Sequence, residues 1–142
     1  MSKPRAVLDT NVLVAALRSR TGASFEVLQR LRRGEWTAVL SNHLVHEYEE
    51  ALKRHAAALS LSLPDVDQLL NAICARGDEW QLTDERKPIL RDPDDEPLAQ
   101  LARESRTPVI VTHNTRHLRP AEALGIRVLK PKDFLAILRQ LE

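Results

Sequence analysis

Residues 5–16 read RAVLDTNVLVAA, and the polar residues in the middle of this stretch decide how the chain folds there. Asp9, Thr10 and Asn11 interrupt what is otherwise an apolar run. Burying an unpaired ionised carboxylate is very unfavourable, so a buried carboxylate is hydrogen-bonded, paired with a cation or bound to a metal. The run therefore turns a corner at Asp9 and exposes it, or Asp9 has a partner elsewhere in the chain.

Composition predicts one folded domain that spans residues 1–142. The chain is 43% hydrophobic and 29% charged, with four glycines, which argues against disorder. Its single cysteine, Cys74, excludes an intrachain disulfide and is typical of a small core residue in a reducing compartment. No segment approaches the ~20 apolar residues of a membrane span. We therefore expect a soluble cytoplasmic protein with no membrane partner.

The net charge of +1 argues against a protein that is basic over its whole surface. Binding to a phosphate backbone needs only a basic stripe, and the sequence contains local clusters of arginine. A solvated helix face explains each cluster equally well. The clusters are Arg18 and Arg20; Arg30, Arg32 and Arg33; Arg103 and Arg106; and Arg116 and Arg119.

Short apolar runs alternate with longer helical patterns, which is typical of βαβ units and a mostly parallel sheet. The pattern predicts an α/β fold with about five strands and helices on both faces. The predicted strands are residues 6–9, 37–41, 79–82, 109–112 and 126–129. The predicted helices are residues 12–19, 24–33, 42–54, 64–77, 97–105 and 131–141, with a long polar loop before residue 97.

Polar residues follow three of these strands directly. Asp9 ends the first strand, Ser41 ends the second, and Thr112 to Asn114 follow the strand at residues 109–112. Ligands of open parallel sheets bind outside the carboxyl ends of the strands, so these residues should gather at one edge. Asp9 then lies where the chain turns, either as the cap of the next helix or as part of a site.

The helix at residues 42–54 carries three glutamates whose roles its periodicity does not separate. Glu50 is expected to point to water, and Glu47 and Glu49 flank the apolar stripe on opposite sides. Glu47 lies one turn closer to the start of the helix, hence nearer Asp9. The apolar stripe consists of Leu44, Val45, Tyr48, Ala51 and Leu52, and Ser41 or Asn42 is the expected cap.

A second acidic group precedes the helix at residues 97–105. Asp92, Asp94, Asp95 and Glu96 stand within five positions, and helix capping explains only one or two of them. Crowded carboxylates repel one another unless a cation joins them, and oxygen-only ligands suit Mg²⁺ or Mn²⁺. Such an ion activates water and neutralises charge that develops on a phosphate, as in metal-dependent nucleases.

In order along the chain, DTNVLVAAL, SNHLVHE, DPDDEPLAQLA, VIVTHNTRHL and VLKPKDFL resemble the PIN-domain family, particularly the PIN toxins of bacterial toxin–antitoxin systems. The resemblance spans residues 6–138. It implies a three-layer α/β/α sandwich and an Mg²⁺- or Mn²⁺-dependent endoribonuclease that cleaves single-stranded RNA. It also implies a cognate antitoxin protein and a homodimer, which is common among such toxins.

The resemblance assigns roles to individual residues. Asp9, Glu47 and Asp95 match the catalytic, metal-binding carboxylates, with Asp92 the alternative to Asp95. Thr10, Asn11 and Thr112 match small polar residues that support the site. Asn114 stands where the family pattern has an aspartate, so the site has one negative charge fewer. Arg116 and Arg119 directly follow Asn114 and are the expected contacts to RNA phosphates.

Three other interpretations compete. A phospho-receiver domain would use Asp9, Thr112 and Lys130, but no internal strand ends in a phospho-accepting aspartate, since Ser41 and Asn42 follow the second strand. A haloacid-dehalogenase-type phosphatase would need an aspartate in place of Asn11. A PIN-fold binding module for RNA or protein, catalytically weak because of Asn114, is the main alternative to an active nuclease.

Overall fold

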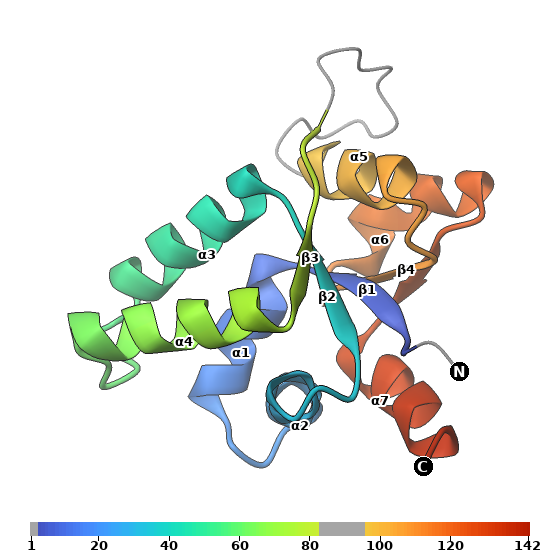
Figure 1. Ribbon diagram of the computed structural model, residues 1–142. Helices are drawn as coiled ribbons and strands as arrows, with labels where there is room; N and C mark the ends of the chain where they lie inside the picture. Colours follow the sequence, from blue (N-terminus) through green and yellow to red (C-terminus); the bar gives the residue numbers. More distant parts are fainter. Residues whose placement is uncertain (1–2, 83–95) are drawn as a thin grey trace.

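The computed structural model describes residues 3–82 and 96–142, which form a twisted parallel sheet covered by helices (Figure 1). Within these residues five strands pair in the order β3-β2-β1-β4-β5, and every pairing is parallel. The strands are β1 (Arg5–Leu8), β2 (Thr37–Leu40), β3 (Gly77–Glu79), β4 (Val109–Val111) and β5 (Arg127–Leu129). The predicted α/β/α fold class is confirmed.

Helices cover both faces of the sheet. α1 to α4 lie on one side, where α7 packs against α2, and α5, α6 and the 3₁₀ helix η1 lie on the other (Figure 1). Right-handed crossovers explain this division, because the chain moves in one direction from β1 to β3 and in the other from β3 to β5. The helices are α1 (Thr10–Arg18), α2 (Ala23–Arg32), α3 (Asn42–Arg54), α4 (Leu63–Ala75), α5 (Glu96–Glu104), α6 (Thr115–Leu118), η1 (Arg119–Leu124) and α7 (Pro131–Gln140).

The buried core continues from the sheet into the contact between α2 and α7. Trp36 is 1% exposed, and its ring meets the ring of Phe134 edge-on with centroids 5.1 Å apart. The Trp36 indole donates a hydrogen bond of 2.9 Å to the carbonyl of Val27, so its polar atom is satisfied inside the core. This packing holds α2 and α7 at the sheet and against each other.

The strand order places a topological switch point between β1 and β4. The chain leaves β1 towards β2 on one side and leaves β4 towards β5 on the other. Connections that diverge in this way open a crevice at the carboxyl ends of the two strands, where open α/β sheets bind their ligands. Asp9 follows β1 directly and Thr112 follows β4 directly, so both lie at this crevice.

The observed order also excludes the phospho-receiver interpretation. A receiver-type sheet has the order 2-1-3-4-5, whereas here β2 separates β1 from β3 and β1 pairs with β4. Within the described residues, no helix combines the length and the apolar character that crossing a membrane requires.

One predicted element differs from the structure, and two short helices were not predicted. The third strand is Gly77–Glu79 rather than residues 79–82. At Gly77 the strand packs closely on β2, because a Cβ there would lie 2.3 Å from Leu40 Cδ1 and the leucine would have to shift. The sequence analysis also missed α6 and η1, since four- and six-residue helices are too short to show an apolar period.

Candidate active site

Asp9 lies at the switch point as a buried carboxylate in the N-cap position of α1. It precedes α1 in extended conformation, but its side chain makes no capping hydrogen bond, and Asp9 is only 8% exposed. Its Oδ2 atom accepts a hydrogen bond of 2.7 Å from the hydroxyl of Thr112. Its backbone N–H donates to the carbonyl of Val111 at 2.9 Å, which continues the pairing of β1 with β4. The tertiary fold therefore holds this carboxylate in one orientation.

Glu47 faces the same cleft from α3. Ser41 caps α3 by accepting a hydrogen bond of 3.1 Å from the N–H of Leu44, which resolves the choice between Ser41 and Asn42. Thr10 Oγ1 lies 3.5 Å from Glu47 Oε2, and His43 Nε2 lies 3.3 Å from Glu47 Oε1. Glu49 instead pairs with Lys53 at 3.6 Å, away from the cleft.

Tyr48 fixes the position of α3 relative to β1. The tyrosine is completely buried, and its hydroxyl donates a hydrogen bond to the carbonyl of Leu8, the residue before Asp9. Burial raises its pKa well above the ordinary value for tyrosine, and the carboxylates of Asp9 and Glu47 raise the pKa further. The hydroxyl therefore stays a donor, and this contact sets the helix register that brings Glu47 opposite Asp9.

A short hydrogen-bond network joins the remaining polar residues of this edge. The backbone N–H of Asn114 donates to the hydroxyl oxygen of Thr112 at 3.0 Å, so Thr112 links Asn114 to Asp9. Asn11 Oδ1 accepts a hydrogen bond of 3.2 Å from the backbone N–H of His113. The imidazole of His113 lies 3.1 Å from the hydroxyl of Ser24 on α2. These contacts connect the starts of α1, α2 and α6.

Asp9 and Glu47 open onto a cleft of about 230 Å³, which we call the acidic cleft. Glu50 lines it too and is exposed to solvent, as the sequence predicted. It lies three residues after Glu47, one helical turn along the same face of α3. The complete lining is Asp9, Thr10, Glu47, Glu50, Ala51, Arg54 and Leu98.

Two sets of effects act in opposite directions on the pKa of Asp9 in the acidic cleft. Burial raises the pKa of Asp9, and the nearby Glu47 carboxylate adds to this effect. The hydrogen bond from the Thr112 hydroxyl acts in the other direction, as do the backbone N–H groups of Asn11 and Thr10 near the carboxylate, and these effects favour the ionised form. A cation at the cleft would remove the repulsion between the two carboxylates.

The residues present fit a hard divalent cation. Asp9 and Glu47 are carboxylates that face one cleft, and the hydroxyls beside them are also oxygen donors, as Mg²⁺ and Mn²⁺ prefer. Within residues 3–82 and 96–142, no three His, Cys, Asp or Glu side chains form a complete metal site. The predicted third carboxylate, Asp95, and its alternative Asp92 lie outside the described residues.

The two arginines predicted to bind RNA lie just beyond this site. Arg116 is in α6 and Arg119 begins η1, and both side chains are exposed. α6 starts immediately after Asn114, which occupies its N-cap position without a side-chain capping bond.

The sequence analysis missed three residues that position this edge. Tyr48 was assigned only to the apolar stripe, and His113 and Ser24 had no assigned role. One signal for Tyr48 was available, because the only tyrosine of the chain lies next to Glu47. No sequence signal pairs Ser24 with His113, which lie 89 positions apart.

A family model described as the PIN domain matches residues 5–116 of the chain. The search of curated proteins found no match to this chain. Among solved structures, the chain is similar to one in the crystal structure of VapBC2 from Rickettsia felis bound to a DNA fragment from their promoter. That match has a TM-score of 0.58 and 16% sequence identity, and it covers 89% of this chain and 98% of the other. At this identity the likeness is one of fold.

Proposed function

The chain belongs to the PIN-domain family, and on this basis we propose that it is an Mg²⁺- or Mn²⁺-dependent endoribonuclease that cleaves single-stranded RNA. One observation carries the proposal: Asp9 is a buried carboxylate held by Thr112 and faces Glu47 across the acidic cleft. A stable fold gains nothing from two carboxylates placed in this way, so the arrangement favours a site for a cation.

Asp9, Glu47 and Asp95 would hold the metal ion. In the sequence Asp95 directly precedes Glu96, the first residue of α5, and Leu98 of α5 lines the acidic cleft. Asp92 and the amide oxygen of Asn114 are the further oxygen ligands. A bound Mg²⁺ or Mn²⁺ supplies a water of lowered pKa and neutralises charge that develops on the scissile phosphate.

The residues around the carboxylates keep them in position. Thr112 orients Asp9 through its hydroxyl, and Thr10 lies within contact of Glu47. Asn11 ties the loop after β4 to α1 through the His113 backbone. Because these groups are held by the fold before substrate binds, they need little reorganisation during the reaction. Arg116 and Arg119 would bind phosphates of the RNA next to the cleft.

The biological role that we propose is the toxin of a toxin–antitoxin pair. The similar solved structure contains VapBC2 of Rickettsia felis bound to promoter DNA. By analogy, this chain would bind a cognate antitoxin protein and form a homodimer in the cytoplasm. Analogy of fold is the support for this step, and the site itself supports only the nuclease chemistry.

A second candidate function rests on Asn114. The side chain of Asn114 is neutral, so it adds no negative charge to the site. Its backbone N–H donates a hydrogen bond to Thr112, which in turn holds Asp9. A PIN fold that binds RNA or protein but cleaves poorly would retain this arrangement. Metal-dependent cleavage separates the two functions.

The test is cleavage of a single-stranded RNA labelled with a fluorophore and a quencher, in Mn²⁺ and in EDTA. We expect cleavage in Mn²⁺ only, and a loss of about 100-fold or more in Asp9→Asn. Asp67→Asn is the matched control, because Asp67 is an exposed carboxylate on α4, outside the acidic cleft. Full cleavage by a folded Asp9→Asn protein would reject the assignment of Asp9. RNA binding without cleavage in any divalent metal would favour the binding module.

A further inference from the structure

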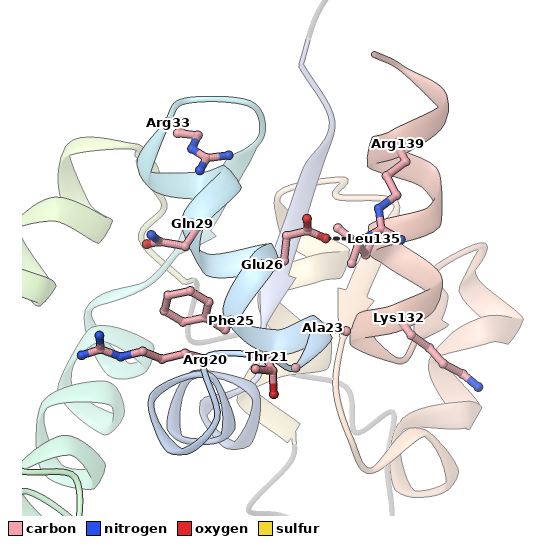
Figure 2. A pocket seen from close by; sticks show the side chains of 11 residues that line it. Arg20, Thr21, Ala23, Phe25, Glu26, Gln29, Arg33, Lys132, Leu135 and Arg139 are labelled. Atoms are coloured by element: carbon pink, nitrogen blue, oxygen red, sulfur yellow. Dashed lines mark hydrogen bonds and ion pairs between the residues drawn. The ribbon is translucent and has the colours of Figure 1, made fainter.

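A second, larger groove runs along α2 and α7, and most of its charged side chains are cationic. Its volume is about 490 Å³, and we call it the α2–α7 groove. Arg20, Arg33, Lys132 and Arg139 line it together with the ring of Phe25 (Figure 2). The net charge of the chain is only +1, so the groove concentrates positive charge locally.

These cations are mostly free to bind an external anion. The one carboxylate that lines the groove, Glu26, accepts a hydrogen bond of 2.7 Å from Arg139 (Figure 2). Arg20 and Lys132 have no carboxylate partner within residues 3–82 and 96–142. Arg33 approaches Glu35 only at 4.0 Å, and its side chain is 67% exposed.

The α2–α7 groove adjoins a hollow that reaches the loop after β4. A neighbouring hollow of about 320 Å³ shares Gly22, Ala23 and Lys132 with it, and His113 lines the hollow at its other end. The backbone N–H of His113 donates to Asn11, two residues after Asp9. His113, which lines the hollow, is therefore bonded to the start of α1 at the same edge of the sheet as Asp9.

The walls of the groove are rigid. Trp36 joins the two helices by its hydrogen bond to Val27 and its contact with Phe134, and the ion pair between Arg139 and Glu26 crosses from α7 to α2. A ligand does not have to order these helices when it binds, which lowers the entropic cost of binding.

We infer that the α2–α7 groove binds the sugar-phosphate backbone of single-stranded RNA on one side of the scissile bond. The inference rests on the proposed function and extends it. An endonuclease substrate continues beyond the cleaved phosphate, so the strand has to leave the active site along the protein surface. The groove offers cations at intervals along such a path, beginning with Lys132 near His113 and ending at Arg33 and Arg139.

Phe25 favours RNA over an acidic protein segment as the occupant. Its half-buried ring lies in the groove between Arg20 and Gln29 (Figure 2). Grooves for single strands combine cations for the backbone with aromatic rings on which bases stack. Phe25 lies on α2 at helical spacing from Leu28 and Leu31. Those two leucines are buried, whereas Phe25 contacts the core only in part.

The test measures RNA binding in an Asp9→Asn background, so that the RNA is not cleaved. Fluorescence anisotropy with a labelled single strand of about 16 nucleotides gives the dissociation constant at several salt concentrations. For Arg20→Ala with Lys132→Ala we expect weakening on the order of tenfold. The slope of log K against log salt should fall by about 1.4, because each phosphate contact of a single strand contributes about 0.7. Arg127→Ala, an exposed arginine at the start of β5, is the control and should change neither value.

Strand length separates groove binding from a general effect of charge. With a strand of about 4 nucleotides, too short to reach from the acidic cleft along the groove, the double variant should bind like its parent. Equal weakening for both lengths would overturn the inference.

Glu26→Gln gives an effect of the opposite sign. Removing this carboxylate frees Arg139 and raises the positive charge of the groove, so the long strand should bind more tightly and with a steeper salt slope. Unchanged or weaker binding of the long strand would contradict the inference. If Glu26 had only a structural role, Glu26→Gln would not bind RNA more tightly.

The outcomes distinguish this inference from the proposed function. If the unmodified protein cleaves RNA in Mn²⁺ and the groove variants bind RNA normally, the groove assignment fails and the nuclease stands. If the groove binds oligoglutamate through Arg20 and Lys132 but does not bind RNA, its occupant is an acidic protein segment and the inference is wrong. If the unmodified protein neither binds nor cleaves RNA, both fail.

Discussion

Asp9 illustrates how a single residue can serve function at the expense of stability. Its carboxylate is buried, its pKa is raised by that burial and by Glu47, and its side chain makes no capping hydrogen bond to α1. The hydrogen bond from Thr112 orients Asp9 but only partly offsets the cost of desolvation. In metal-free buffer, Asp9 therefore destabilises the fold.

Replacing this charge should stabilise the metal-free protein. Asp9→Asn keeps an oxygen that can accept the Thr112 hydroxyl and removes the repulsion with Glu47. We expect a higher free energy of unfolding at pH 7 in EDTA, measured by urea denaturation. The exposed control Asp67→Asn should change stability by no more than about 0.5 kcal/mol. A stability loss in Asp9→Asn alone would show that the carboxylate supports the fold.

Asn114 is expected to limit how many metal ions bind. With Asp9, Glu47 and Asp95 as ligands, one divalent ion is well neutralised, whereas a second ion lacks a carboxylate. The unmodified protein should bind one Mn²⁺ tightly, and Asn114→Asp should tighten binding and permit a second ion. Calorimetric titration with Mn²⁺ measures both quantities, with Asn71→Asp on α4 as the control for added charge. Two tight sites in the unmodified protein, or equal titrations of the unmodified and Asn114→Asp proteins, would reject this role for Asn114.

At the scale of single elements, α3 shows how one contact selects the functional face of a helix. Residues 47 and 49 are two positions apart, so their side chains point in different directions. The Tyr48 hydroxyl binds Leu8, which turns Glu47 into the acidic cleft and leaves Glu49 with Lys53. The helical periodicity of the sequence alone does not decide whether Glu47 or Glu49 faces the cleft.

The two glutamates should therefore differ in their effect on activity. Glu47→Gln should lower Mn²⁺-dependent RNA cleavage by about 100-fold, since it removes one of the proposed metal ligands. Glu49→Gln should retain cleavage and lose at most ~0.5 kcal/mol of stability, because its ion pair with Lys53 is exposed. Initial cleavage rates of both variants measure this difference. The reverse order of activities would show that Glu49, not Glu47, lies on the functional face of α3.

The start of α4 gives a stability that depends on pH. Ser62 and Asp65 form a capping box: the Asp65 N–H donates to Ser62 Oγ at 3.1 Å, and the Ser62 N–H donates to Asp65 Oδ2 at 2.8 Å. The hydrogen bond from the Ser62 backbone N–H to the carboxylate, and then the Ser62 hydroxyl acting on the same carboxylate, lower the pKa of Asp65. The ionised form is thus favoured in the folded state.

Because the folded pKa is lowered, this contribution is present at neutral pH and is lost as pH falls through that pKa. Asp65→Asn should be less stable than the unmodified protein at pH 7, and the difference should shrink towards pH 3. Urea denaturation at both pH values measures the change. Asp67→Asn, two positions along α4 and outside the capping box, should show no such dependence. A difference that grows on acidification would contradict the sign.

At the scale of the whole molecule, the order of the strands decides where the chemistry lies. The switch point between β1 and β4 brings Asp9 and Thr112 together from positions 103 residues apart. α6 and η1 follow on one side of this point, and α2 and α7 meet on the other. Basic residues therefore lie on both sides of the switch point, as the proposed binding of a single strand would require.

Arg116 and Arg119 should bind RNA on the α6 side of the cleft. Converting both to alanine in the Asp9→Asn background should weaken binding and lower the salt slope by about 0.7 for each phosphate that is no longer bound. The control is the double variant Arg32→Ala with Arg127→Ala. It removes the same amount of charge at two exposed positions that line neither the acidic cleft nor the α2–α7 groove. Anisotropy measures the affinities. Equal affinity and slope in the Arg116 and Arg119 variant would remove these residues from the RNA surface.

Much of the fold could be predicted from the sequence, because periodicity and turn residues are local. The runs at residues 6–9, 37–41 and 109–112 and the helices between them agree with the structure to within a few residues. The observed β3 begins two residues before the predicted strand. Its position depends on the pairing with β2, where Leu40 closely approaches Gly77. α6 and η1 were not predicted, because helices this short show no apolar periodicity in the sequence.

That Asp9 ends a buried strand at the carboxyl edge of a parallel sheet follows from the sequence alone, since neighbouring residues carry both the alternation and the position of the turn. Three other relations came from tertiary structure: Thr112 orients Asp9, Glu47 rather than Glu49 faces it, and Arg20 and Lys132 share a groove. These relations join residues far apart in the chain. Strand order and helix packing set them, and neither is encoded in the period of any single segment.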